Sequence, residues 1–139
     1  MNQSIIFIFA AIIIVGALLF ALTCINKKGT KHLDVERYRV KYLEIENHLK
    51  RDESSSYQLT VLNADKLVDQ ALIERGVKGQ TMGERMKNSV QLFSDLNGVW
   101  AAHKLRNRIA HESDVNVTYN EAQYALGCFK KALKDLGAI

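Results

Sequence analysis

Apolar residues form one unbroken run at the start of the chain and a periodic pattern through the rest. The first 26 residues carry no charged side chain, and residues 5–25 read IIFIFAAIIIVGALLFALTCI. As a helix rising about 1.5 Å per residue, this segment would reach about 31 Å, the thickness of the hydrocarbon core of a bilayer. The pattern therefore predicts a transmembrane helix over 5–25, after a short extracytoplasmic N-terminus over 1–4.

The topology of this predicted span follows from the basic residues after it. These are Lys27, Lys28, Lys31, Arg37 and Arg39. By the positive-inside rule they predict a single-pass inner-membrane protein with its N-terminus outside, a basic linker over 26–32 and a cytoplasmic domain over 33–139. A cleaved secretory signal or lipidation at Cys24 is the alternative, but a signal peptide usually begins with basic residues and has a shorter apolar core.

Beyond the linker, apolar residues recur at spacings of three and four, which is typical of helices with one buried face. The periodic segments lie at about 33–49, 57–75, 82–93, 99–112 and 118–137. A kink or restart is expected near the polar residues at 95–98. The first segment is too short for a confident coiled coil, so packing within a bundle is the favoured interpretation. The predicted fold class is all-α, a mainly antiparallel bundle of four to five helices.

Two helix starts have a sequence signature of their own. Thr81 precedes Glu84 by three residues, and Thr118 precedes Glu121 by the same spacing. This is the capping-box pattern, so helices should begin near residues 82 and 119. The first of these helices is expected to turn Met86, Val90 and Phe93 inward.

The composition limits the kinds of site and partner that the chain could have. The chain has no proline and two cysteines, Cys24 and Cys128, whose placement suits neither a disulfide framework nor a metal site. The formal net charge of +4 is compatible with an acidic partner such as RNA but too small to require one. No metal and no cofactor are expected.

One motif points to a family. Residues 100–112 read WAAHKLRNRIAHE, in which Arg106, Asn107 and His111 form the pattern Arg-Asn-x-x-x-His. This resembles the HEPN superfamily, small helical bundles marked by an arginine, an adjacent polar residue and a histidine four to six residues further on. The resemblance implies a metal-independent ribonuclease that brings two such motifs together. Since this chain has one motif, activity would require a homodimer.

Helix geometry assigns roles to these residues. Asn107 and His111 share a face, with His103 four residues before Asn107. His111 is the candidate general acid or base, Arg106 would stabilise charge on a phosphate, and Asn107 would orient either group. His103, Lys104 and Arg108 are candidate binding residues.

Simpler interpretations of the same residues stay open. The motif side chains could hold the following loop through hydrogen bonds to its backbone, and Lys104 and Arg108 could be solvated surface residues. Trp100 is expected in the core, with stacking on an RNA base as the alternative. The predicted function is therefore a membrane-anchored HEPN-like domain that binds or cleaves RNA. The alternative is a non-catalytic helical module that recruits a protein partner to the membrane.

Overall fold

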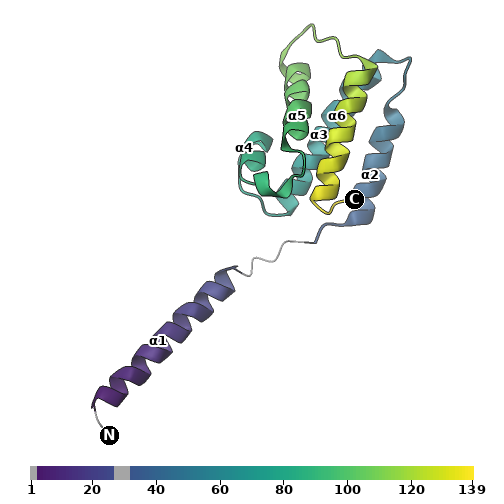
Figure 1. The fold of residues 1–139 in the computed structure, drawn as a ribbon. Coiled ribbons are helices and arrows are strands. Elements are labelled where there is room, and N and C mark those ends of the chain that lie inside the picture. The colour runs from purple at the N-terminus through teal and green to yellow at the C-terminus, as the bar shows by residue number, and fades with distance from the viewer. Residues whose placement is uncertain (1–2, 27–31) are drawn as a thin grey trace. The chain divides into compact units, whose positions relative to one another are not determined.

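The computed structural model describes residues 3–26 and 32–139, with side chains described over 7–21 and 32–139. The chain divides into two compact units, Met1–Thr30 and Lys31–Ile139, which are treated separately below (Figure 1).

The first unit contains one helix, α1 (Gln3–Asn26). Within the described part of the chain, no helix combines the length and the apolar character needed to cross a membrane. The predicted transmembrane helix over 5–25, the single-pass topology and the inner-membrane location are therefore wrong. Most of the predicted linker over 26–32, and the first two residues of the chain, lie outside the described residues.

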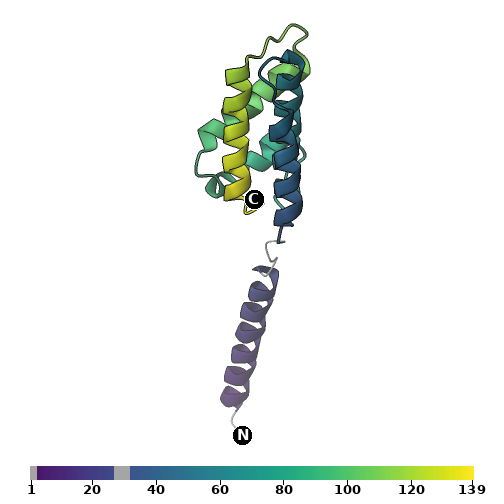
Figure 2. The ribbon, with the colours of Figure 1, turned by 90° about the vertical axis from the view of Figure 1, so that its right-hand side faces the viewer.

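The second unit is all-α over the residues that the structure describes. Its helices are α2 (Val35–His48), α3 (Ser54–Glu74), α4 (Met82–Lys87), α5 (Leu96–His111) and α6 (Tyr119–Asp135), with a 3₁₀ turn η1 (Val90–Leu92). The central helix is α3, which packs against α2, α4, α5 and α6, while α5 also packs against α6. Both views show α2 and α6 side by side (Figures 1 and 2). The predicted helical bundle is confirmed in this unit.

Local hydrogen bonds explain where several helices begin and end. The Thr81 hydroxyl accepts from the backbone N–H of Glu84, and Thr118 forms a complete capping box with Glu121. The predicted starts of α4 and α6 are thus confirmed. At its other end, α6 stops where Gly137 adopts a φ of +67°. That left-handed conformation is one that glycine adopts without the steric penalty of a Cβ.

The segment predicted as one helix over 82–93 is instead broken after Lys87. The buried Ser89 hydroxyl donates to the backbone carbonyl of Arg85, offering the chain an alternative to continued helix. Met86 and Phe93 are buried as predicted, but Val90 is 45% exposed, so its predicted inward position is wrong.

The core lies between α3, α6 and the inner face of α2. The largest buried residues of α2 are Tyr38 and Tyr42, each at most 2% exposed. The Tyr42 hydroxyl donates to the carbonyl of Leu126 on α6 over 3.0 Å. The apolar stripe of the first periodic segment therefore packs within the bundle, as favoured from the sequence.

Candidate functional site

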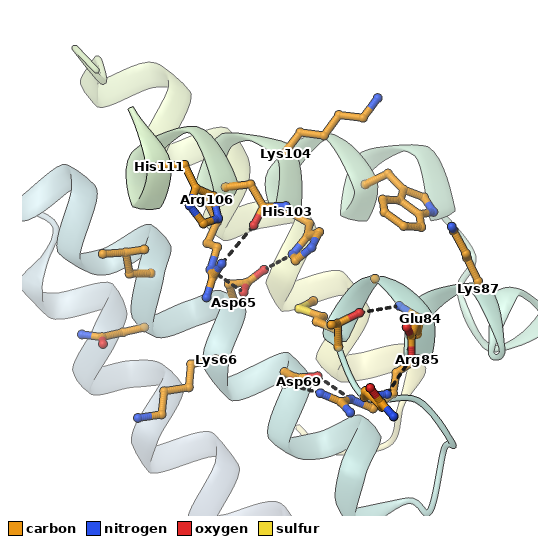
Figure 3. A pocket seen from close by; sticks show the side chains of 18 residues that line it. Asp65, Lys66, Asp69, Glu84, Arg85, Lys87, His103, Lys104, Arg106 and His111 are labelled. Carbon is orange, nitrogen blue, oxygen red and sulfur yellow. Dashed lines mark hydrogen bonds and ion pairs between the residues drawn. The ribbon is translucent and has the colours of Figure 1, made fainter. Parts of the chain in front are cut away.

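A groove of about 1050 Å³ lies between α3, α4 and α5 (Figure 3). Its lining is rich in charge. The charged residues that line it are Asp65, Lys66, Asp69, Glu84, Arg85, Lys87, Lys104 and Arg106, accompanied by His103 and His111.

A buried carboxylate organises the middle of the groove. Asp65 on α3 is 3% exposed. Its Oδ1 lies 2.7 Å from Nδ1 of His103, and its Oδ2 lies 3.2 Å from Nε of Arg106, both on α5. One acidic side chain thus holds two basic side chains of the neighbouring helix, as the dashed lines in Figure 3 show.

This contact fixes the tautomer of His103. An ionised carboxylate only accepts hydrogen bonds, so Nδ1 of His103 carries the proton that Asp65 accepts. The other nitrogen, Nε2, is left for the groove. The imidazole also meets the ring of Trp100 edge to face, with the ring centroids 6.0 Å apart. His103 is therefore clamped on two sides, by a carboxylate and by an indole.

Arg106 is held in the wall of the groove but keeps donors to spare. An Nη1 hydrogen bond of 2.9 Å reaches Oδ1 of Asn107. The Nε group is close enough to Asp65 for an ion pair, although the pair lacks the alignment of a hydrogen bond. Because a guanidinium has five N–H donors, these two contacts use a minority of them. The side chain is 35% exposed, so a ligand can reach it.

The structure brings five of the six predicted site residues to this groove. They are His103, Lys104, Arg106, Asn107 and His111. Arg108 does not line it and instead lies 3.8 Å from Glu112. His111 is exposed at the last residue of α5.

A second ion pair forms the other end of the groove and fastens α4 to α3. Arg85 is 7% exposed and donates from Nε and Nη2 to the two oxygens of Asp69, each over 2.7 Å. Its Nη1 donates to the carbonyl of Gly79. The hydrogen bonds with Asp69 outweigh the effect of burial and raise the pKa of Arg85 above its ordinary value. Arg85 and Asp69 therefore neutralise each other.

The groove also contains three lysines, which differ from its arginines in their ion pairing. Lys66 on α3, Lys87 on α4 and Lys104 on α5 are exposed. None of the three forms an ion pair with any residue that the structure describes. The uncompensated charge of the groove is therefore mainly positive.

Sequence reasoning missed Asp65, Lys66 and Lys87. The sequence did mark Asp65, because this residue lies four positions after Val61 and three before Val68, on the buried face of α3. A carboxylate in a buried stripe of a helix requires a partner, and such partners are often functional. Nothing in the sequence marks Lys66 or Lys87 apart from other surface lysines.

Comparison with protein-family models, curated proteins and solved structures gives no match for this chain. The resemblance to the HEPN superfamily therefore rests on Arg106, Asn107, His111 and the helical bundle, and it stays a prediction. Among the described residues, no group of three or more His, Cys, Asp or Glu side chains is arranged to hold a metal ion.

Proposed function

We propose that this chain is a HEPN-like helical domain that binds RNA in the groove between α3, α4 and α5 and cleaves it by metal-independent acid–base chemistry. The observation that carries the proposal is the shared groove. Arg106, Asn107 and His111 all line it, together with exposed lysines from three helices. A groove with uncompensated positive charge attracts phosphate groups.

The proposed reaction is a transesterification within the RNA backbone. The ribose 2′-oxygen attacks the neighbouring phosphorus, the bond to the 5′-oxygen breaks, and a 2′,3′-cyclic phosphate and a 5′-hydroxyl result. His111 takes the 2′-hydroxyl proton or delivers a proton to the leaving 5′-oxygen, since imidazole does either near neutral pH. Arg106 stabilises the charge that develops on the phosphate oxygens, while Asn107 orients the guanidinium.

The reaction needs one group that takes a proton and another that delivers a proton. A homodimer is therefore part of the proposal. Each chain supplies one exposed histidine to the motif, His111. The other histidine of the groove, His103, already gives one ring nitrogen to Asp65 and is 7% exposed. Two copies with their grooves facing each other would provide the base and the acid from two equivalent His111 side chains.

A non-catalytic module that binds a protein partner is the second candidate. It is favoured by the contact of Asp65 with both His103 and Arg106, because such a buried network also serves simply to join α3 to α5. In that case Arg106 and His111 would not reach a phosphate, and the groove would bind an acidic segment of another protein.

The experiment that separates these candidates incubates the full chain with single-stranded RNA in excess chelator. His111→Gln and Arg106→Lys are compared with His48→Gln and Arg108→Lys, which alter the same residue types outside the groove. Loss of a general acid or base typically lowers the rate by roughly 100- to 10,000-fold, and we expect losses of this order in the groove variants alone. Equal cleavage by all four variants would indicate a contaminant, and absence of both cleavage and RNA binding would favour the protein-binding module.

A further inference from the structure

A glycine in α4, Gly83, lies beside Trp100, and the fold does not require a glycine there. Gly83 has none of the positive φ values found at other glycines of the described chain, so its backbone does not demand glycine. A Cβ at this position would meet nothing closer than Cη2 of Trp100, at 3.7 Å, which is ordinary contact. Since glycine is a poor helix former, an alanine here would suit α4 better. Without a side chain at Gly83, α4 covers this edge of the indole less than it would with any other residue.

Trp100 is held in place in a way that suits stacking. Its ring is packed edge to face against His103, and His103 is in turn fixed by the buried carboxylate of Asp65. The indole is half-buried and lines the groove. A rigid aromatic ring in the wall of a basic groove is the usual platform for an unpaired nucleobase.

The three unpaired lysines come from three different helices that line the groove, Lys66 from α3, Lys87 from α4 and Lys104 from α5. Figure 3 shows them at separate places along its edge, with Lys66 and Lys104 extending outward. Two carboxylates of the lining are already neutralised, the buried Asp65 by Arg106 and the partly buried Asp69 by Arg85.

The lining has one exposed carboxylate, Glu84, against three exposed lysines. Glu84 accepts a hydrogen bond from the backbone N–H of Gln80 over 2.7 Å and forms no ion pair with any of the lysines. The lysines therefore face solvent with no partner among the described residues and are available to phosphates.

The spacing along α5 indicates more than one nucleotide. Trp100 and His111 are separated by about 16 Å along the helix axis, at about 1.5 Å per residue. A base stacked on Trp100 therefore cannot belong to the phosphate that meets His111. The ligand must be a chain of nucleotides that follows α5.

We infer that the indole of Trp100, beside Gly83, forms a base-stacking subsite, and that Lys66, Lys87 and Lys104 hold the phosphates of a single-stranded RNA running from this subsite toward His111. The inference rests on the proposed function and specifies its substrate. A duplex is excluded from the subsite, because its bases are already stacked and paired.

The first test uses Trp100 as its own reporter, since it is the single tryptophan of the chain. The probe is a 2′-O-methyl oligouridylate, which lacks the 2′-hydroxyl needed for cleavage, so binding is measured without the reaction. We expect the single strand to quench tryptophan emission and the same strand annealed to its complement to quench it less. Gly83→Leu should place a side chain against the indole and weaken binding roughly five- to hundred-fold, the range of one stacked base.

Folding of the variants is checked by circular dichroism. Gly83→Leu replaces glycine by a better helix former within α4, and Trp100→Phe keeps an aromatic ring in the wall. Neither Trp100 variant carries the fluorescent reporter, so the affinity of each is measured by its competition with the unmodified chain for the probe. We expect Trp100→Phe to retain more affinity than Trp100→Ala. Equal affinity of the two Trp100 variants would overturn the stacking.

The second test measures the phosphate contacts of the lysines through the salt dependence of RNA binding. A groove triple variant carries Lys66→Ala, Lys87→Ala and Lys104→Ala, and a matched control of equal net charge carries Lys41→Ala, Lys78→Ala and Lys134→Ala. The slope of log affinity against log salt changes by about 0.7 for each phosphate contact to a single strand. The groove triple should therefore lose about 2 units of slope, and the control should lose far less.

The outcomes distinguish this inference from the proposed function. Equal loss of slope in both triples, or unchanged quenching in Gly83→Leu, would overturn the subsite while leaving RNA binding in place. No binding of the probe to the unmodified chain would overturn the proposed function and the subsite together. Binding with the expected slopes but no cleavage of unmodified RNA would support the subsite and overturn catalysis.

Discussion

The central helix α3 contacts the rest of the bundle through apolar and through acidic side chains, and the two kinds differ in what they contribute to the fold. Val61, Val68 and Leu72 are fully buried and apolar. Asp65 and Asp69 lie on the same helix but form ion pairs, with Arg106 of α5 and Arg85 of α4. The helix is thus joined to the bundle partly by apolar packing and partly by charge pairs that line the groove.

The difference shows which contacts stabilise the fold. Burying an apolar side chain gains free energy by removing it from water, whereas the attraction within a buried ion pair is largely offset by the loss of hydration. Ion pairs are therefore a weak means of stabilising a small bundle. Their presence around one groove is better explained by their effect on geometry, because Asp65 orients His103 and Arg106 and leaves only the lysines uncompensated.

The largest loss of stability is expected from a substitution in the apolar core. Phe129 of α6 is 0% exposed, and replacement by alanine should lower the free energy of unfolding by about 3–5 kcal/mol. Urea denaturation followed by circular dichroism measures this loss. Tyr124→Ala is the control, since this aromatic residue of the same helix is 61% exposed and should change stability far less. Similar losses in the two variants would mean that the core is not where the structure places it.

An intermediate loss of stability is expected from a substitution at the acidic positions of α3. Asp65→Asn removes the negative charge that meets Arg106 and His103 while keeping the size of the side chain. A buried polar network that loses one partner typically loses about 1–3 kcal/mol, so this change should be smaller than that of Phe129→Ala. Urea denaturation again measures it, with Asp114→Asn as an exposed control. A loss as large as that of Phe129→Ala would show that the groove stabilises the fold as strongly as the core does.

The parts of the fold that the sequence predicted well are determined locally. Thr81 and Thr118 cap their helices through residues three positions away, so the signature and its effect lie in the same turn. The position of Val90 was mispredicted because a serine hydroxyl ended the helix, a competition that apolar periodicity does not register. The membrane span was predicted from unbroken apolar character over 5–25, and none of the described helices meets the requirement for crossing a membrane.

The candidate site was predictable only where its residues share one helix. Arg106, Asn107 and His111 fall on neighbouring faces of α5, and the structure places all three in the groove. Lys104 and Arg108 are four residues apart and share a face of α5, yet only Lys104 lines the groove, so helix periodicity alone could not remove Arg108 from the prediction. Asp65 lies 38 residues before His103 in the chain, and the sequence does not specify how α3 and α5 align.

The smallest effect is expected at a charge pair away from the groove, between Arg37 of α2 and Glu74 of α3. Their side chains are 41% and 31% exposed, and Nη2 lies 2.6 Å from Oε2. Burial raises the pKa of Glu74, but the hydrogen bonds from Arg37 and Gln70 and the charge of Arg37 together outweigh it, so that the pKa lies below its ordinary value of 4.5. A carboxyl group with a lowered pKa stabilises the fold above its ordinary pKa, and this contribution is lost as the pH falls through the lowered value.

The difference between the native chain and Glu74→Gln should therefore be present at pH 7 and shrink in acid. Because water and salt screen an exposed pair, we expect a difference in Tm of no more than about 2 °C at pH 7. Thermal denaturation between pH 7 and pH 3 measures it, with the exposed Glu44→Gln as the control. A difference that grew in acid would reverse the assigned direction of the pKa. A difference at pH 7 larger than that of Asp65→Asn would mean that exposed charge outside the groove contributes more to stability than the buried carboxylate within it.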